Sequence, residues 1–414
     1  MREELLSLSP GRCVKSIELF AGAGGLAIGT ARAGFDHEAV IEWDHDACDT
    51  LRLNCHAGSG HRGEWNIVEG DVAKFDFKPY AAKIDVITGG PPCQPFSLGG
   101  KHGGHEDERN LFPQAIRAVR EIEPQAFLFE NVKGLLRKNF ANYYSYIIHQ
   151  LRFPDVRQRG DEEWPDHLSR LEKLTTGGKH NGLKYNVVFR LLNSADYGVP
   201  QQRWRVLIVG VRSDLNIEFS FPERGTHEED ALLYDKWVSG DYWERHRVPK
   251  KERPAMPERL RKRVGGLASW MPWMMLQPWR TVRDAIADMP RISAGQSSSK
   301  LSNHFLNPGA RSYAGHTGSG YDEPAKALKA GDHGVPGGEN TLRQLDGTVR
   351  YFSVRECARL QTFPDEWSFA SSWTESMRQL GNAVPVRLAE TIATRLRQTI
   401  VAAKVAKSGA VAIR

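Results

Sequence analysis

The sequence predicts an α/β protein in which a mostly parallel sheet is combined with a smaller, irregular inserted domain. Three observations support this fold class. Short apolar segments alternate with helix-like segments from residue 16 to about residue 210, as expected for βαβ units. Between residues 213 and 345 the helical periodicity fades, and Pro, Gly, Trp and basic residues accumulate. After residue 346 the helical periodicity returns, so the last helices are expected to close back on the first part of the chain.

The individual elements follow from the same patterns. Buried strands are expected at residues 16–20, 38–43, 84–90, 126–132 and 205–211, and helices at residues 352–363 and 383–406. The polar stretch 154–182 is interpreted as a surface insertion. We therefore expect three parts: residues 1–212 and 346–414 form the large domain, and residues 213–345 form the inserted one.

Composition narrows the class of protein. The chain has 414 residues, of which 40% are hydrophobic and 26% charged, as in ordinary globular proteins. No apolar run reaches the roughly 18 residues of a transmembrane helix, and the N-terminal sequence lacks an apolar signal core. No membrane association and a cytoplasmic location are therefore expected. The five cysteines are scattered without a C-x-x-C pair, which predicts neither a disulfide framework nor a metal site.

The positive charge is concentrated in one segment. The whole chain carries a net charge of +6, and residues 244–263 alone hold nine Lys and Arg against three Glu. Such a block near tryptophans indicates a polyanionic partner, although a solvated surface loop would have the same composition. The candidate contacts in this segment are Lys250, Lys251, Arg253, Arg261, Lys262 and Arg263.

A glycine-rich turn follows the first expected strand. In "KSIELFAGAGGLAIG" (residues 15–29), Gly22, Gly24 and Ala27 fit the G-x-G-x-x-G/A spacing, and Glu42 lies 20 residues after Gly22. This spacing is typical of dinucleotide-binding proteins, in which the acid accepts hydrogen bonds from ribose hydroxyls. S-adenosylmethionine presents the same adenosine, and a purely structural turn would have the same glycines. Trp43 is either an adenine-stacking residue or a core aromatic.

Cys93 occupies a segment that can be neither helix nor central strand. In "GGPPCQPFS" (residues 89–97), two glycines and two prolines precede the cysteine and a third proline follows. The apolar segment before it ends in glycines, so Cys93 is expected on a stiff loop at the carboxyl end of a strand. Such a cysteine is either an inert turn residue or a nucleophile.

Eight motifs, taken in order, resemble the DNA cytosine-5 methyltransferases. They are "ELFAGAGG" (18–25), "EWD" (42–44), "GDV" (70–72), "GGPPCQPFS" (89–97), "FENVKG" (129–134), "YGVPQQRWRV" (197–206), "RYFSVRECARLQTFPD" (350–365) and "QLGNAVP" (379–385). They cover residues 16–210 and 346–400. Residues 213–345 fall where this family places its target-recognition domain.

The resemblance implies a Rossmann-like methyltransferase fold and S-adenosylmethionine as the cofactor, with S-adenosylhomocysteine as the product and no metal. The implied cofactor contacts are Phe20, Gly22, Gly24, Gly25, Leu26, Glu42, Trp43, Asp71, Val72, Pro92, Asn382 and Ala383.

Cys93 and Glu130 are the residues to which the resemblance assigns the chemistry. A thiolate that adds to carbon 6 of cytosine makes carbon 5 nucleophilic, and a free cysteine with a pKa of about 8.5 must be activated to supply that thiolate. Glu130 ends an apolar strand and is expected to point into the same cleft. A carboxyl group there can protonate nitrogen 3 and accept a hydrogen bond from the exocyclic amine.

Arg203 and Arg205 alternate along an expected strand, so both face one side of it and Trp204 the other. By resemblance, Arg205 faces a base flipped out of the duplex and Arg203 helps to hold the site. Gln94, Ser97 and Gln201 are additional candidate DNA contacts.

The resulting hypothesis is a bacterial, monomeric enzyme that methylates cytosine in double-stranded DNA, alone or beside a cognate restriction endonuclease. Three alternatives stay open: a tRNA methyltransferase on the same scaffold, a non-catalytic DNA-binding protein, and an NAD oxidoreductase suggested only by the glycine spacing.

Overall fold

The computed structural model describes most of the chain. The described residues are 13–55, 64–92, 110–177, 179–269, 275–292, 298, 300–312, 317–330 and 338–411. Side-chain burial is defined as far as residue 402 at the C-terminal end. Cys93, Gln94 and Ser97 lie outside the described residues.

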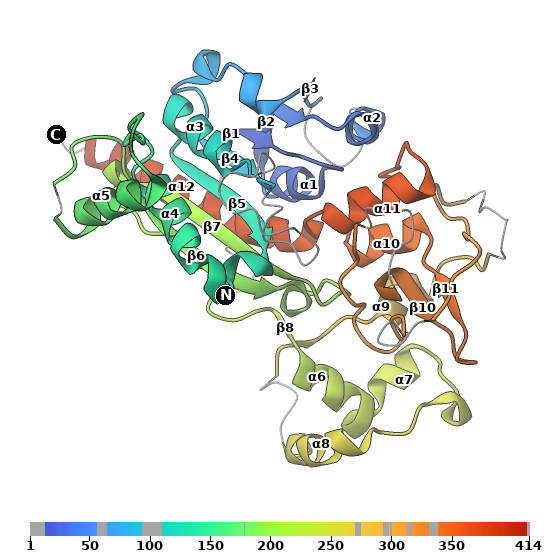
Figure 1. Cartoon of the computed structure of the whole chain (residues 1–414). Coiled ribbons are helices and arrows are strands. Elements are labelled where there is room, and N and C mark those ends of the chain that lie inside the picture. The colour runs from blue at the N-terminus through green and yellow to red at the C-terminus, as the bar shows by residue number, and fades with distance from the viewer. Residues whose placement is uncertain are drawn as a thin grey trace.

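A seven-stranded sheet forms the centre of the molecule (Figure 1). Its strands are β1 (Val14–Leu19), β2 (Phe35–Glu42), β3 (Ile67–Glu69), β4 (Val86–Gly89), β5 (Ala126–Val132), β6 (Tyr185–Asn193) and β7 (Trp204–Arg212). Their order across the sheet is β3-β2-β1-β4-β5-β7-β6, and only β7 runs in the direction opposite to the other six strands. The carboxyl ends of the five parallel strands β1 to β5 therefore meet at one edge of the sheet.

Twelve α-helices are present in the described part of the chain. They are α1 (Gly25–Arg32), α2 (His45–Asn54), α3 (Phe112–Ile122), α4 (Ala141–Arg152), α5 (Trp164–Gly177), α6 (Glu229–Tyr234), α7 (Asp241–Arg245), α8 (Arg261–Leu267), α9 (Val282–Ile286), α10 (Val354–Leu360), α11 (Trp373–Asn382) and α12 (Val386–Val411). None of them is long and apolar enough to cross a membrane.

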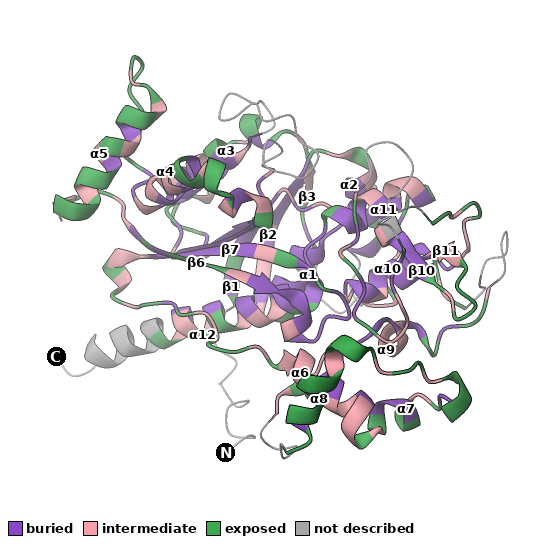
Figure 2. Ribbon diagram, turned by 60° about the horizontal axis from the view of Figure 1, so that its bottom comes forward, coloured by how far each residue is buried: buried purple, intermediate pink, exposed green. Residues whose placement is uncertain are grey.

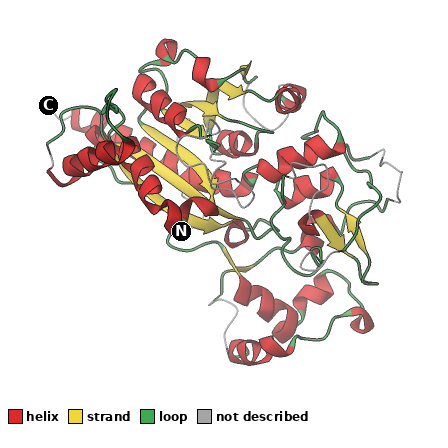
Figure 3. Ribbon diagram, viewed as in Figure 1, coloured by secondary structure: helices red, strands yellow, loops and turns green. Residues whose placement is uncertain are grey.

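Two helical layers cover the sheet. On one face, apolar side chains of α3 and α4 pack against Ile17, Ile87 and Phe127. On the other face, α1 and α12 pack against Val86 and Leu128. The strand side chains alternate between these two layers, because successive residues of a strand point to opposite faces. The mostly parallel α/β fold predicted from the sequence is thereby confirmed (Figure 3).

The five expected strands are present, and two strands of the sheet were not expected. β3 has only three residues, and β6 is an edge strand in which Val188, Phe189 and Arg190 are all exposed, so neither has a regular apolar pattern. The expected surface insertion contains α5, whose His167 and Leu171 are buried. The hydroxyl of Tyr146 on α4 lies 2.8 Å from Nδ1 of His167, so this helix is attached to the large domain.

The segment expected as the inserted domain consists of two differently packed parts. Residues 229–276, here called the helical lobe, contain α6, α7 and α8 with small apolar clusters of their own. The lobe is attached through two paired strands, β8 (His227–Glu228) and β9 (Gln277–Pro278). Figure 2 shows that much of its outer surface is exposed.

The described residues between 282 and 342 instead share a core with the large domain. Val282, Ile286 and Leu328 belong to one cluster with Ala27 of α1 and Leu380 of α11. A hairpin of β10 (Thr341–Arg343) and β11 (Val349–Tyr351) then leads into α10. The helical lobe is therefore the part of residues 213–345 that has apolar clusters of its own, and hydrogen bonds from Lys236 and Tyr242 to Asp322 join it to the remainder.

Candidate active site

The glycine turn between β1 and α1 forms one side of the site. Phe20, Gly22 and Gly24 have positive φ angles of 56°, 52° and 89°. A Cβ atom added at Gly22 would find no atom within 4 Å, whereas one at Gly25 would lie 2.3 Å from the carbonyl oxygen of Val384. Gly22 thus borders open space that a ligand can enter, and Gly25 is required for close packing against the C-terminal segment.

Glu42 ends β2 beside this turn and organises it. Its Oε2 accepts a hydrogen bond from the backbone N–H of Gly22 at 2.7 Å, and its Oε1 accepts from the N–H groups of Trp43 and Asp44 at 2.9 and 2.8 Å. Burial raises the pKa of Glu42 despite these hydrogen bonds. Carboxylate oxygens have further acceptor sites, so Glu42 can also receive ribose hydroxyls.

Trp43 is unusual because 76% of its surface is exposed. This exposure rules out a core role in the described structure and leaves the indole available to stack on a ligand. Nearby, the N–H of Gly70 donates to the carbonyl of Glu42 at 2.8 Å, which places Asp71 and Val72 beside the same strand end. Asp71 is exposed, and one of its carboxylate oxygens accepts from the Ala73 N–H at 2.8 Å.

The remaining predicted cofactor residues come from three segments. Leu26 is buried in the first turn of α1. Asn382 is exposed at the end of α11, and the Cβ of Ala383 would lie 3.4 Å from a Cβ added at Gly25. Pro92 ends the described part of the loop after β4. Open space at Gly22 and the exposed Trp43 and Asn382 fit a ligand that contains adenosine.

Glu130 and Arg205 form an ion pair at the carboxyl end of β5. Both side chains are largely buried, with about a tenth of each exposed, and their charged atoms are in direct contact. Burial raises the pKa of Glu130, and the positive charges of Arg205 and Arg203 offset part of that effect. A carboxyl group in this environment can hold a proton at a higher pH than an exposed glutamate can.

Arg203 has a different environment from Arg205. Its side chain is buried, and it donates hydrogen bonds to the carbonyl of Leu328 at 2.8 Å and to the carbonyl of Gly381. Arg203 therefore connects β7 to two segments far away in sequence. The expected alternation is present, because Trp204 between the two arginines is 42% exposed.

Asn131 positions the beginning of the loop that carries Cys93. Its Nδ2 donates to the carbonyl of Pro91 at 2.8 Å, and its Oδ1 accepts from the N–H of Val132 at 2.9 Å. The carbonyl of Pro92 in turn accepts from the N–H of Leu111 at 3.0 Å. Pro92 and Leu111, the described residues near either side of segment 93–109, are therefore hydrogen-bonded to each other, and Pro91 is bonded to the residue after Glu130.

The predicted DNA contact at Gln201 needs a correction. Its side chain is completely buried, where Oε1 accepts from the N–H of Leu328 at 3.2 Å and Nε2 donates to the carbonyl of Leu360 at 3.5 Å. A residue whose amide is satisfied inside the protein cannot reach DNA from this position. Gln201 instead connects the segment before β7 to residues 325–328 and to the end of α10.

The six basic residues of the helical lobe fall into two groups. Arg253 pairs with Glu244 at 2.6 Å, Arg261 with Glu258 at 2.8 Å, and Arg263 with Glu229 and Asp230 at 3.0 and 2.6 Å. Lys250, Lys251 and Lys262 are exposed, and within the described residues no acidic group forms an ion pair with them.

Glu18 is a buried residue that the sequence reasoning did not assign. It is completely buried on β1, where it accepts a hydrogen bond from the hydroxyl of Thr88, and burial raises its pKa to about 8. An acidic residue inside an apolar strand is the signal that could have identified it. No group of three or more metal-ligating side chains occurs among the described residues.

The strand order, the glycine turn and the acid that ends β2 define a Rossmann-like α/β fold. The crystal structure of the Dnmt2 methyltransferase of S. pombe superposes with a TM-score of 0.53 at 16% identity, covering 94% of this chain and 99% of that one. The family model for C-5 cytosine-specific DNA methylases matches residues 14–154 and 169–398, and the chain belongs to this family.

Two curated relatives extend over nearly the whole chain. The type II methyltransferase M.PspPI of Psychrobacter is 34% identical over 390 residues, which are 94% of this chain and 80% of that protein. M.NgoMIV of Neisseria gonorrhoeae is 34% identical over 384 residues, or 92% of this chain and 96% of that protein. The chain is thus a DNA cytosine-5 methyltransferase that uses S-adenosylmethionine. The residues that the family model skips, 155–168, lie in the insertion before and within α5.

Proposed function

We propose that this protein methylates cytosine within one specific sequence of double-stranded DNA, using Cys93 as nucleophile and Glu130 as proton-holding group. The observation that carries the proposal is the buried Glu130–Arg205 pair beside the tethered ends of the Cys93 loop. A catalytic acid needs a raised pKa and a fixed position, and the surroundings of Glu130 provide both.

The residues have distinct roles in this proposal. The Cys93 thiolate adds to carbon 6 of a flipped cytosine while Glu130 protonates nitrogen 3, so that carbon 5 becomes nucleophilic. Bound S-adenosylmethionine supplies the methyl group, which carbon 5 accepts as S-adenosylhomocysteine leaves. Loss of the carbon 5 proton to a base then restores the double bond and expels the thiolate, and the nitrogen 3 proton returns to the Glu130 carboxylate. Arg205 orients Glu130 and contacts the base, and Arg203 holds β7 in place.

The cofactor is proposed to lie across the carboxyl ends of β1, β2 and β4. Gly22 allows its close approach, Glu42 accepts its ribose hydroxyls, Trp43 stacks on its adenine and Asp71 contacts the adenine edge. Asn382 and Ala383 complete the pocket from the C-terminal segment. This arrangement is supported by the open space at Gly22 and the exposed indole of Trp43.

Partners and context complete the proposal. The helical lobe is proposed to contact DNA through its exposed lysines. Gln94 and Ser97 are proposed to contact DNA from the loop that follows Cys93. Because the relatives M.PspPI and M.NgoMIV are bacterial type II methyltransferases, we propose that the protein is a cytoplasmic bacterial enzyme, acting as a monomer. It is either the partner of a cognate restriction endonuclease or a solitary methylase.

Bisulfite sequencing of DNA from an expressing host tests this proposal. We expect fully protected cytosines at one recurring sequence, and none when Cys93→Ala replaces the wild-type enzyme. Protected cytosines in the Cys93→Ala host would contradict the covalent mechanism. Tritiated methyl transfer to plasmid DNA and to total tRNA is the second measurement, because labelling of tRNA alone would replace DNA by RNA as the substrate.

A further inference from the structure

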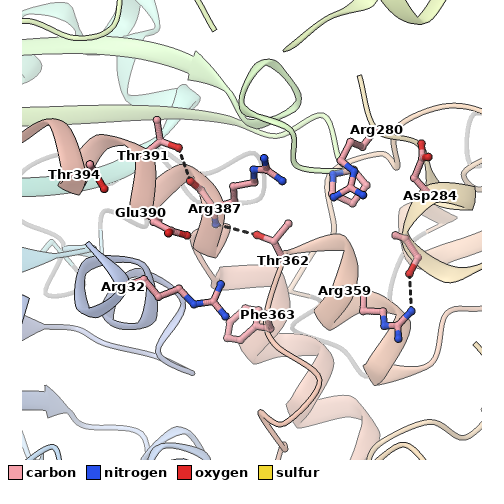
Figure 4. Close-up of a pocket in the computed structure, with 12 residues that line it drawn as sticks. Arg32, Arg280, Asp284, Arg359, Thr362, Phe363, Arg387, Glu390, Thr391 and Thr394 are labelled. Atoms are coloured by element: carbon pink, nitrogen blue, oxygen red, sulfur yellow. Dashed lines mark hydrogen bonds between the residues drawn. The ribbon is translucent and has the colours of Figure 1, made fainter. Parts of the chain in front are cut away.

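A charged cavity is formed by residues that the proposed mechanism does not use. It has a volume of about 670 Å³ and is lined by side chains of α1, α9, α10 and α12 and by Pro200 before β7 (Figure 4). Its size is within the range of about 300–1,000 Å³ that is usual for small-molecule sites. None of the residues assigned to the cofactor, to the base or to catalysis lines it.

Positive charge dominates the lining. Arg32, Arg280, Arg359 and Arg387 come from four separate parts of the chain, and the acidic residues of the cavity are Asp284 and Glu390. Two of these charges already have partners outside the cavity lining. Arg359 pairs with Asp288 and Asp365 at 2.5 and 2.7 Å, and Asp284 pairs with Arg245 at 3.8 Å.

The other three arginines differ from Arg359 in this respect. Within the described chain, no acidic group forms an ion pair with Arg32, Arg280 or Arg387, and Glu390 is the acid that remains for all three. Arg280 and Arg387 repel each other: burial lowers the pKa of Arg387, and the charge of Arg280 lowers it further. The pKa of neighbouring His227 is lowered to about 4, mainly by burial and further by the positive charges of Arg387 and Arg280.

The place of Arg387 in its helix adds a further argument. Arg387 is the second residue of α12, where a positive side chain is opposed by the helix dipole. Its backbone N–H already donates to the hydroxyl of Thr362 at 2.9 Å, so it is the side chain that is available to a ligand. Figure 4 shows the Arg387 and Arg280 side chains extending into the same region.

We infer that this cavity binds a phosphate-bearing polyanion through Arg32, Arg280 and Arg387. Guanidinium groups pair with phosphate oxygens in bidentate fashion, and an anion would remove the mutual repulsion of the arginines. The aromatic lining residue, Phe363, is 3% exposed and offers no face for a nucleobase, so recognition depends on phosphate oxygens. The phosphates belong either to a free compound such as a polyphosphate or to a DNA backbone.

The position of the cavity indicates which parts of the protein a bound polyanion would connect. Arg280 follows β9, the strand through which the chain returns from the helical lobe, and His227 is in β8 on the outgoing side. Arg32 and Arg387 belong to the large domain. A polyanion bound by all three arginines would therefore link the segment that follows β9, at the base of the helical lobe, to the large domain.

Calorimetric titration with sodium tripolyphosphate at low ionic strength tests the site. We expect the wild-type protein to bind, and the Arg280→Gln/Arg387→Gln double variant to bind at least tenfold more weakly. Arg395→Gln is the matched control, because this exposed residue is on the same helix α12 but does not line the cavity. Circular dichroism melting confirms that each variant is folded.

The source of the phosphates is separated by a second measurement. The salt dependence of binding to a DNA duplex is compared between the wild-type protein and the double variant. A smaller slope in the variant assigns the site to DNA phosphates, and an equal slope assigns it to a free phosphate compound. Absence of tripolyphosphate binding by the wild-type protein, or equal affinity in all three proteins, would overturn the inference.

Discussion

Two buried carboxyl groups, Glu18 and Glu130, lie on the same face of the sheet in different surroundings. Glu18 of β1 is level with Thr88 of β4, which is level with Leu128 of β5. Glu130 comes two residues after Leu128, so it points to the same face and lies closer to the carboxyl edge of the sheet. Glu18 receives one hydrogen bond from Thr88, whereas Glu130 contacts Arg205. Burial therefore favours a neutral Glu18, and at Glu130 the arginines oppose that effect.

Glu18 should make stability depend on pH. Its folded pKa of about 8 is above the ordinary value of 4.5, so its stabilising effect is complete below pH 4.5 and is lost as the pH rises through 8. The loss has an upper limit of roughly 1.4 kcal/mol per pH unit in this window. We expect Glu18→Gln, which stays neutral, to flatten the profile. Urea unfolding at pH 5 and pH 8 measures this; parallel profiles would show that Glu18 ionises normally.

Glu130→Gln tests whether the carboxyl group acts on the base. The amide keeps the shape of the side chain but cannot supply a proton, so we expect the methyl-transfer rate to fall by about 10²- to 10⁴-fold. Cofactor affinity should stay within twofold, because Glu130 lies outside the proposed cofactor pocket. Single-turnover methylation and calorimetry with S-adenosylhomocysteine are the measurements. A rate within threefold of the wild type would remove Glu130 from the chemistry.

At the scale of elements, the turn between β1 and α1 has two separate tasks. Gly22 borders open space and donates its N–H to Glu42, whereas Gly25 lies against the carbonyl of Val384 before α12. The first position shapes a surface for a ligand, and the second allows α1 and the C-terminal segment to pack closely. One turn therefore joins the proposed cofactor surface to the packing of the C-terminal segment.

Two alanine substitutions should separate these tasks. Gly22→Ala needs a positive φ of 52°, which costs about 1 kcal/mol, and its methyl group enters the ligand side. We expect cofactor binding at least tenfold weaker with a small loss of stability. Gly25→Ala would place a Cβ 2.3 Å from the carbonyl oxygen of Val384, so we expect a loss of about 1–3 kcal/mol. Denaturant unfolding and cofactor titration of both variants measure this, and identical effects would contradict the division.

For the whole molecule, sequence patterns located the central sheet, and the site residues that they single out stay a prediction. The strands around Glu18 and Glu130 are continuous apolar runs, and the glycine turn has a recognisable spacing. Gln201 was misplaced because its burial depends on Leu328 and Leu360, which are 127 and 159 residues away. The pairing of Arg263 with Glu229 and Asp230 likewise depends on how α8 packs against α6. Contacts between distant segments leave no local pattern.

Because its three lysines, unpaired within the described residues, are exposed, the helical lobe should contribute to DNA affinity through them. We expect Lys250→Gln/Lys251→Gln/Lys262→Gln to weaken binding to all duplex sequences. The slope of log affinity against log salt should decrease by about 0.9 for each phosphate that the variant no longer neutralises. Arg253→Gln/Arg263→Gln is the comparison, because these arginines pair with acids of the lobe and should change the slope less. Fluorescence anisotropy at several salt concentrations measures both. The three lysines are exposed and take no part in the apolar clusters of the lobe, so their replacement should leave its folding intact. An unchanged slope in the triple variant would therefore place the DNA interface elsewhere.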